Sequence, residues 1–381
     1  MAARLLSLFR DGFSRRDAVL CLVMMLASAG LWHLPTGFES RRPQGLFNAV
    51  GTVLAVDDQR VRQYGLVREG EQRLSVRIDG GPLDGRTVEA ENTLMGKLEL
   101  DAFFAPGDRA LLNLALADGR ITAARAVDHD RLGLEAGLFA AFAVLLMALG
   151  FWSGLRALVS FVFAILMIWK ALVPLALKGY APVPAGFAVA ALIVAAIVAL
   201  VGGLNRRGLV AFAGSFLGLT LALGLALALA PAARLNGAVR PFSETLLYSG
   251  FPGLDLAGIF IAGIFIAASG AMVDLSMDLA SAMAELARHR PDLGRWDLFA
   301  SAISIGRAVT GTMTTTLLLA YSGGTLTMLM LFMGQGLPLA NILNLTYVSS
   351  EIFHTLVGSI ALVATAPLTA LVGAMAFARR A

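Results

Sequence analysis

Three charged side chains lie among apolar residues, where they could take part in moving an ion or solute. Asp274 and Asp278 follow a long apolar run and are four residues apart, so on a helix both lie on one face. Arg307 lies inside the next apolar segment. A charge in the middle of a bilayer costs roughly 3 kcal/mol or more, so such residues are candidates for a pathway through the membrane.

The Arg307 face continues with small and hydroxyl residues at helical spacing, namely Thr310, Gly311 and Thr314. Residues 285–297 form a charged loop, so the helices before and after it are expected to be antiparallel. Counted from this loop, Asp278 and Arg307 have matching depths. We predict an ion pair between them, with Asp274 one turn deeper, because pairing removes much of the desolvation cost. An equally simple interpretation is that the pair only locks two helices together.

A second candidate site lies near the start of the last apolar segment. Its residues again follow helical spacing, and they are Glu351, His354, Thr355 and Gly358. A carboxylate with an imidazole one turn away can relay a proton or bind a divalent cation, so a metal at this pair stays open. The alternative is structural, since a carboxylate at a helix start stabilises the helix dipole.

No motif in the chain indicates an enzyme or a cofactor site. There is no Ser-His-Asp spacing and no metal-binding histidine motif, and the glycines of Ser322-Gly323-Gly324 lack the following lysine of a phosphate-binding loop. The single cysteine, Cys21, excludes an internal disulfide framework. We therefore predict a protein that is not an enzyme and that needs no cofactor.

The composition indicates a membrane protein with one water-soluble part. Only 15% of the 381 residues are charged and the mean hydropathy is +0.76, whereas soluble proteins average about 25% charged residues. Half of the charges, 28 of 56, lie in residues 39–131. The sequence pI near 9.6 does not indicate nucleic-acid binding, because the arginines lie between apolar segments and form no stripe with aromatic residues.

Residues 39–131 are predicted to form a small β-barrel, OB-like in size. Alternating apolar and polar residues predict strands at 50–56, 74–78, 87–91, 111–117 and 121–127. The last two are expected to pair around an Asp118-Gly119 turn. This domain offers a surface for a protein partner.

The remaining segments predict an α-helical polytopic membrane domain. Residues 1–17 precede an apolar anchor at 18–35, and 134–378 contain the other spans, giving eight in all. Residues 325–333 are too short to span and are bounded by glycines, which favours a re-entrant or broken segment. A cleaved export signal ending at Ala27-Ser28-Ala29 is the alternative for the first segment, but the apolar run continues past Ala29.

Basic residues predict the orientation of these spans. With the N-terminus inside, ten arginines lie in inner segments and three basic residues lie in short outer loops. The ten are Arg4, Arg10, Arg15, Arg16, Arg156, Arg206, Arg207, Arg288, Arg290 and Arg295, and the three are Lys178, Arg234 and Arg240. Residues 39–131 are then outside the cytoplasm, and both termini are inside.

The sequence resembles the YibE/F family of bacterial membrane proteins over roughly residues 45–375. The motifs that carry the resemblance are Val88-Glu89-Ala90-Glu91-Asn92-Thr93-Leu94, Pro106-Gly107-Asp108, the stretches 268–278 and 306–317, Ser350-Glu351-Ile352, Gly358-Ser359-Ile360 and 366–370. Thr315 stands where the family often has Asn, and Ala308 where an acidic residue often follows the arginine. The resemblance implies a multi-pass protein of the bacterial inner membrane, but it implies no substrate.

Two classes of function follow from these features. The broken segment and the charged residues favour a transporter or channel-like protein for a cation, a proton-coupled solute or another small solute. The alternative is a non-transporting scaffold or assembly factor that binds a partner through residues 39–131. Apart from the lipid bilayer, the expected partners are an ion, a solute or a protein, and not nucleic acid.

Overall fold

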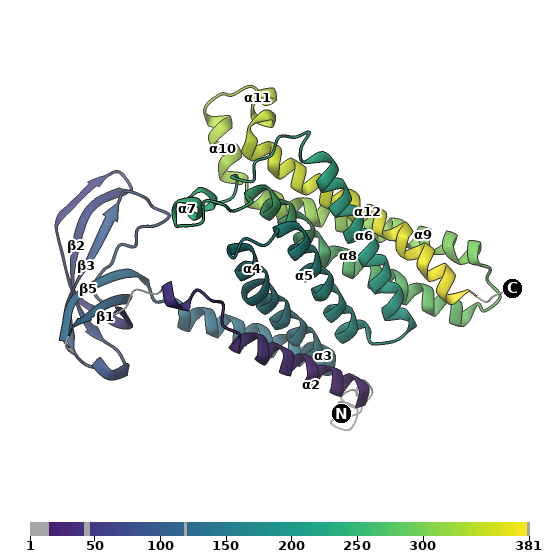
Figure 1. Ribbon diagram of the computed structural model, residues 1–381, viewed down its shortest axis with the longest axis horizontal. Helices are drawn as coiled ribbons and strands as arrows, with labels where there is room; N and C mark the ends of the chain where they lie inside the picture. The colour runs from purple at the N-terminus through teal and green to yellow at the C-terminus, as the bar shows by residue number, and fades with distance from the viewer. Residues whose placement is uncertain (1–14, 42–45, 118–119, 379–381) are drawn as a thin grey trace. The chain divides into compact units, whose positions relative to one another are not determined.

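The computed structural model describes residues 15–41, 46–117 and 120–378. The chain divides into two compact units, one formed by Gly37–Leu145 and the other by Met1–Thr36 together with Leu146–Ala381. Each unit has a hydrophobic core of its own. Figure 1 shows the first unit as a β-barrel and the second as a bundle of helices.

The first unit confirms the predicted small β-barrel. Its five strands close in the order β1-β2-β3-β5-β4, with β3 and β5 parallel and the other pairs antiparallel. The strands are β1 (Leu46–Tyr64), β2 (Val67–Ile78), β3 (Thr87–Met95), β4 (Arg109–Ala117) and β5 (Arg120–His129), with two short 3-10 turns, η1 (Glu39–Arg41) and η2 (Gly81–Leu83). Side chains of β3 are alternately exposed and buried, as expected for a strand with one face on a core. The predicted Asp118-Gly119 turn lies outside the described residues.

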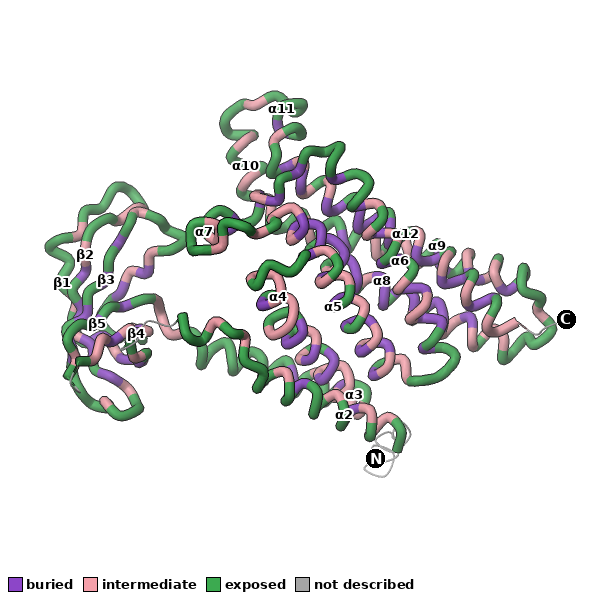
Figure 2. The backbone as a smooth tube through the Cα atoms, in the orientation of Figure 1, coloured by how far each residue is buried: buried purple, intermediate pink, exposed green. Residues whose placement is uncertain are grey.

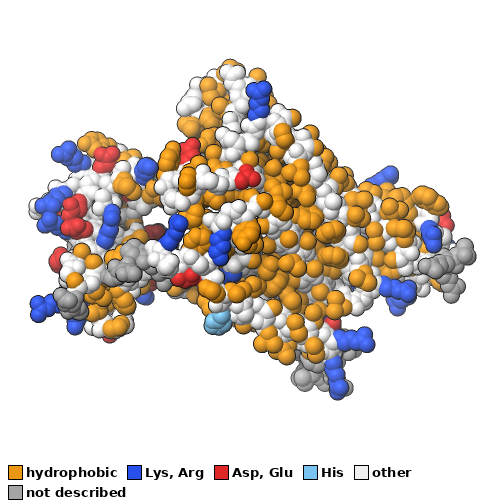
Figure 3. Space-filling model, in the orientation of Figure 1, with side chains coloured by type: hydrophobic (Ala, Val, Ile, Leu, Met, Phe, Trp, Pro, Cys, Tyr) orange, Lys and Arg blue, Asp and Glu red, His pale blue; other side chains and the backbone are white. Residues whose placement is uncertain are grey.

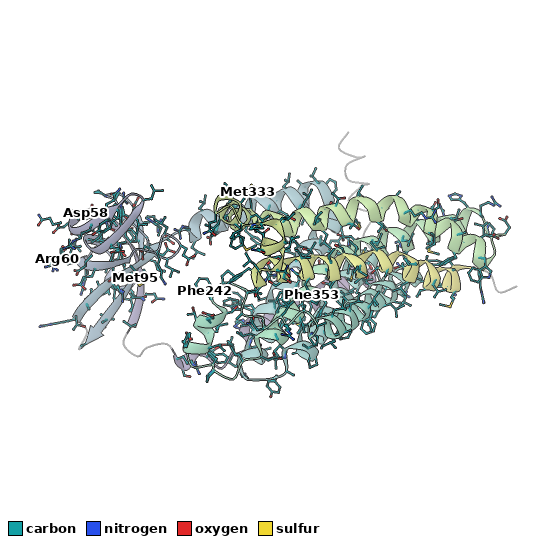
Figure 4. The ribbon with its side chains drawn as sticks, turned by 90° about the horizontal axis from the view of Figure 1, so that it is seen from above. Asp58, Arg60, Met95, Phe242, Met333 and Phe353 are labelled. Carbon is teal, nitrogen blue, oxygen red and sulfur yellow. The ribbon has the colours of Figure 1, made fainter. Side chains whose placement is uncertain are left out.

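A buried amide pair fixes the segment between β3 and β4 to the barrel. The Gln72 side chain donates to the Phe104 carbonyl and to Asp58 Oδ1, and its Oε1 accepts from the Phe104 amide and from Asn92. Asn92 also donates to the Ala102 carbonyl at 2.6 Å. Figure 4 shows Asp58 and Arg60 on the barrel. Because buried polar groups need partners, this network specifies where the segment lies.

The second unit contains the helices of the bundle. Their bounds are α2 (Arg15–His33), α3 (Leu132–Leu166, which begins in the first unit), η3 (Met167–Leu172), α4 (Val173–Leu177), α5 (Pro182–Ile197), η4 (Val198–Gly202), α6 (Arg206–Leu229), α7 (Ser243–Tyr248), α8 (Leu256–His289), α9 (Arg295–Gly323), α10 (Leu326–Gly334), α11 (Leu339–Asn344) and α12 (Thr346–Phe377). Buried positions concentrate on α6, α8 and α12 in Figure 2. Hydrophobic side chains cover most of the face of the bundle seen in Figure 3, as expected for contact with lipid.

Small residues allow the central helices to pack closely. A Cβ atom at Gly214 or Gly218 of α6 would lie 2.0 or 2.1 Å from the hydroxyl of Thr369 or Thr365 on α12. Larger side chains at these glycines would therefore force α6 and α12 apart. The structure agrees with the general rule that small residues bring membrane helices together.

The turn between α8 and α9 is held by a charged pair in water. Arg290 donates to both carboxylate oxygens of Asp292, at 2.9 and 3.3 Å from Nε. These hydrogen bonds lower the pKa of Asp292 to about 2, because they favour the ionised carboxylate. The turn makes α8 and α9 antiparallel, as predicted.

Six helices in the described residues are long and apolar enough to cross a membrane, or seven if the bent pair α9–α10 is one span. The pair bends by 62° at the predicted broken segment. One of the six, Leu132–Leu177, has 46 residues and would be about 69 Å long if straight, more than twice a bilayer core. It is interrupted at Phe151, where φ is 47° and ψ is −121°. The count of eight spans stays a prediction.

Candidate functional site

The structure brings four polar side chains together where α9 ends and α12 begins. Glu351 and His354 lie on the first turns of α12, Tyr321 lies near the end of α9, and Arg240 lies in the segment between α6 and α7. We call these four residues the Glu351 cluster. Figure 4 shows the neighbouring Phe353 on α12 and Phe242 at the start of α7.

Arg240 holds both predicted residues of this site. Its Nη1 donates to Glu351 Oε1, and its Nη2 lies 3.1 Å from His354 Nδ1. A guanidinium group can only donate, so Nδ1 must accept this hydrogen bond and cannot carry a proton. The neutral imidazole therefore carries its proton on Nε2. This tautomer is assigned from the hydrogen-bond partners.

Two polar atoms in the cluster are buried without a hydrogen-bond partner among the described residues. They are His354 Nε2 and the Tyr321 hydroxyl, and the two rings lie 4.5 Å apart between centroids. Gly358 packs closely against α8, because a Cβ atom there would lie 3.3 Å from the Ala268 Cβ. An unsatisfied buried polar group costs roughly 1–3 kcal/mol, so each marks a place where a water, an ion or a solute could bind.

A pocket of about 290 Å³ opens beside the cluster. Glu351 and Tyr321 contribute to its wall, and the rest is mostly apolar and comes from α9, α10, α11 and α12, including Leu318, Met328, Leu329, Leu343 and Leu356. The bend between α9 and α10 provides one side of this pocket. A mainly apolar pocket with a few polar groups is the usual form of a small-molecule site.

The predicted ion pair between Asp278 and Arg307 does not form. Both side chains are exposed on their helices, and no ion pair joins Arg307 to a carboxylate among the described residues. The predicted depth agrees with the structure, because a Cβ atom at Gly306 would lie 3.3 Å from the Ala366 Cβ of α12 and 3.9 Å from Leu279 of α8. Gly306 is buried against α12 and α8 and the neighbouring Arg307 is exposed, so the prediction placed the arginine on the wrong face.

The remaining predicted residues lie on α8, α9 and α12. Asp274 is exposed on the same face of α8 as Asp278, as their spacing predicted. Thr314 donates to the Thr310 carbonyl at 2.8 Å, whereas the Thr310 hydroxyl is buried without a partner in the described part of the chain. Thr355 is buried on α12 and lines the 290 Å³ pocket.

Arg240 and Tyr321 are the site residues that sequence reasoning missed. Arg240 was noted only as one of three basic residues in short outer loops, and it is 111 residues before Glu351. No local spacing connects them. The available signal was the charge itself, because a lone arginine beside apolar segments needs a partner.

The metal-binding interpretation lacks a third ligand. Within residues 15–41, 46–117 and 120–378, no three His, Cys, Asp or Glu side chains are placed so that they could hold an ion. Glu351 and His354 can supply two ligands, and Arg240 occupies both. Metal binding at this pair would require Arg240 to move away from both side chains.

A family model described as YibE/F-like protein matches residues 138–379, more than half of the chain. The match includes the stretches 268–278 and 306–317 and the Glu351 cluster, whereas the barrel motif 88–94 lies outside it. No curated protein and no solved structure matches the chain.

Proposed function

The chain belongs to the YibE/F family, and from this premise we propose that it is a transporter for a cation or for a small solute coupled to protons. The observation that carries the proposal is the pair of unsatisfied buried atoms, His354 Nε2 and the Tyr321 hydroxyl, next to a pocket lined by Glu351. In a cluster that serves only to pack the helices, buried polar atoms of this kind are expected to be hydrogen-bonded to other protein groups.

Arg240 acts as an internal cation in this mechanism. Glu351 binds either the guanidinium group or a cation from the pocket, since both need the same carboxylate. Protonation of His354 gives Nδ1 a hydrogen, so it can no longer accept from Arg240 Nη2 at 3.1 Å. Arg240 then moves away from the imidazole, and proton uptake is coupled to the state of the Glu351 carboxylate.

Asp274 and Asp278 form the second part of the proposed pathway. They share one face of α8, and a smaller pocket of about 160 Å³ lies at their level, lined by Met277 and Ser281 of α8 and by residues around the start of α6. With Glu351, they give the pathway three carboxylates, which favour cations and repel anions. Arg307, Thr310 and Thr314 lie on α9 at the matching depth and complete the predicted polar set.

The proposed location is the bacterial inner membrane, with eight spans, the N-terminus inside and residues 39–131 outside. The ten inner arginines against three basic residues in short outer loops support this orientation. The Glu351 cluster then lies at the outer end of α12, where protons and solutes would enter. Cysteines at 206 and 234 in a Cys21→Ala background test the orientation, since an impermeant thiol reagent should label only position 234 in intact cells.

Flux measurements on purified protein in liposomes test the function. Vesicles loaded with pH-sensitive and metal-sensitive dyes should report cation or proton movement, and Glu351→Gln should lower the rate at least about tenfold, or about 1.4 kcal/mol in barrier. The matched control is Glu244→Gln, which removes an exposed carboxylate from α7 and should leave the rate unchanged. Equal rates in both variants would refute a role for Glu351.

A second function is favoured by the barrel. The β1–β2 hairpin exposes Tyr64 at 60% and Leu66 at 83%, and Met95 beside it is 59% exposed. If these three side chains form one contiguous apolar patch, that patch would favour binding of another protein. This scaffold function becomes the better explanation if folded wild-type protein moves no tested solute and a photo-crosslinker at position 66 captures one defined protein, with capture lost in Leu66→Ser.

A further inference from the structure

A larger pocket lies at the other end of α6 from the Glu351 cluster. It has a volume of about 880 Å³ and is enclosed by the first turns of α2, by Arg156 of α3 and by the link between η4 and α6. All of these segments belong to the bundle unit. The 160 Å³ pocket of the proposed transport pathway adjoins it and shares Val201, Gly202 and Arg207 with it, but the pathway assigns no role to the rest of the larger pocket.

The lining of this pocket is strongly basic. It contains four arginines and one carboxylate, namely Arg15, Arg16, Arg156, Arg207 and Asp17. Asp17 lies 3.6 Å from Arg156 and offsets part of the positive charge of that residue. The Arg156 side chain is only 14% exposed, and its Nε has no hydrogen-bond partner among the described residues. A buried guanidinium N–H of this kind needs an acceptor.

The start of α6 adds a further positive potential. Gly203 turns the chain with φ 81°, and the Asn205 side chain caps the helix by accepting from the Gly208 amide at 2.9 Å. Arg206 and Arg207 then begin a helix of 24 residues, whose amino end favours an anion. Arg207 extends this potential into the pocket.

The remaining wall of the pocket is apolar. It is formed by Val19, Leu20, Val23, Val201 and Leu204, and Leu204 is 76% exposed. A small free anion would contact only the arginines and leave this wall uncovered. A phosphate attached to acyl chains would fill both parts, because arginines bind phosphate by paired hydrogen bonds and apolar residues contact the chains.

We propose that this pocket binds the phosphate group of an anionic phospholipid. The lipid would join Arg15 and Arg16 of α2 to Arg156 and Arg207 of the bundle. Such a link has a structural use, because only Cys21 and Ser28 of α2 are buried and the helix has little packing of its own. Binding therefore fixes the first helix to the others.

Lipid titration of the purified, delipidated full-length chain tests the proposal. Phosphatidylglycerol added in detergent should raise the melting temperature and give bound adducts in native mass spectrometry, whereas phosphatidylcholine should do so at least about tenfold more weakly. Arg207→Gln should weaken phosphatidylglycerol binding about tenfold. The matched control is Arg206→Gln, one residue away and outside the pocket lining, which should change binding less than about twofold.

Inorganic phosphate distinguishes a site for a lipid phosphate group from a site for soluble phosphate. If millimolar phosphate alone stabilises the protein and loses this effect in Arg207→Gln, the pocket is a site for soluble phosphate and the lipid assignment is overturned. If Arg206→Gln and Arg207→Gln weaken lipid binding equally, the binding is a general attraction to basic residues and the pocket is overturned. Arg156→Gln could disturb the pair with Asp17, so Arg207→Gln decides the outcome.

Discussion

Gln72 of the barrel and His354 of the bundle are both buried polar side chains, but of these two only Gln72 has a full set of hydrogen-bond partners among the described residues. Gln72 is 0% exposed and makes four hydrogen bonds, two through its amide protons and two through its oxygen. His354 is 6% exposed and has a partner on Nδ1 alone among the described residues. Two side chains that are both buried therefore differ in how many of their polar atoms are hydrogen-bonded.

A buried network whose donors and acceptors are all hydrogen-bonded stabilises one structure. A network with unpaired donors or acceptors can still form hydrogen bonds with a ligand. The Gln72 side chain uses all of its hydrogen-bonding groups to fix the segment between β3 and β4, so it has none left to bind another molecule. His354 Nε2 and the Tyr321 hydroxyl are buried next to a pocket and have no partner among the described residues. The difference predicts that changes at Gln72 act mainly on stability and changes at the Glu351 cluster mainly on transport.

The largest effect on stability is expected from Gln72→Leu. This change leaves the Phe104 amide and carbonyl and one Asn92 proton without partners, and it should lower the free energy of barrel unfolding by roughly 3 kcal/mol or more. Hydrogen exchange measured by mass spectrometry on the full chain should show faster exchange in residues 87–108. The control Gln63→Leu, on the exposed hairpin, should change little. Unchanged exchange in the Gln72 variant would contradict the stabilising role of this network.

The next effect concerns pH at the Glu351 cluster. If His354 exchanges a proton during transport, the wild-type flux should change severalfold or more between about pH 5 and 8. His354→Gln should make the rate nearly independent of pH in this range while the melting temperature changes little.

The matched control for the pH profile is His289→Gln, which removes an exposed histidine at the end of α8. That variant should keep the wild-type profile. A flat wild-type profile, or a profile that survives in His354→Gln, would assign the proton to another group.

Local patterns predicted the fold well where local physics decides it. Alternation in residues 50–56 and 87–91 indicated strands, and glycines around 325–333 indicated the break that appears as the 62° bend. The hairpin at Tyr64 and Leu66 was missed, because its residues are too polar to show a buried face. The interruption at Phe151 lies close to Arg156, which separates the uncharged runs 136–155 and 157–177, and it is flanked by Gly150 and Gly154.

The site was predicted only in part, because its partners come from distant segments. The i, i+3 spacing brought Glu351 and His354 together, but nothing in the spacing connects them to Arg240, 111 residues earlier. For Arg307, counting residues from the loop gave the correct depth. The rotation of α9 was not determined by that count, and Gly306 lies in the contact with α12 and α8 instead.

A smaller effect is expected from Tyr321→Phe. The hydroxyl is buried without a partner among the described residues, so its removal breaks no hydrogen bond and should raise the free energy of unfolding by up to about 1 kcal/mol. The same variant should slow transport if the hydroxyl binds the solute. Tyr347→Phe, at an exposed position near the start of α12, is the control. A loss of stability above about 1 kcal/mol would mean that the Tyr321 hydroxyl has a partner within the protein.

The last prediction concerns Arg307 and Asp278, whose effects on stability should not be coupled. Arg307 and Asp278 lie at one depth but form no ion pair, so Arg307→Leu and Asp278→Leu should change the melting temperature independently. Their coupling free energy should stay within about 0.5 kcal/mol, the usual limit for residues that share no partner. A pair in direct contact would behave differently, because removing one partner strands the other charge at a cost of roughly 3–5 kcal/mol and the double change recovers part of it. Arg240→Leu with Glu351→Leu provides the comparison, since these two side chains do form an ion pair and should show measurable coupling. Strong coupling between Arg307 and Asp278 would show that the two side chains meet in the membrane, and the assignment of α9 rotation given by Gly306 would then have to be changed.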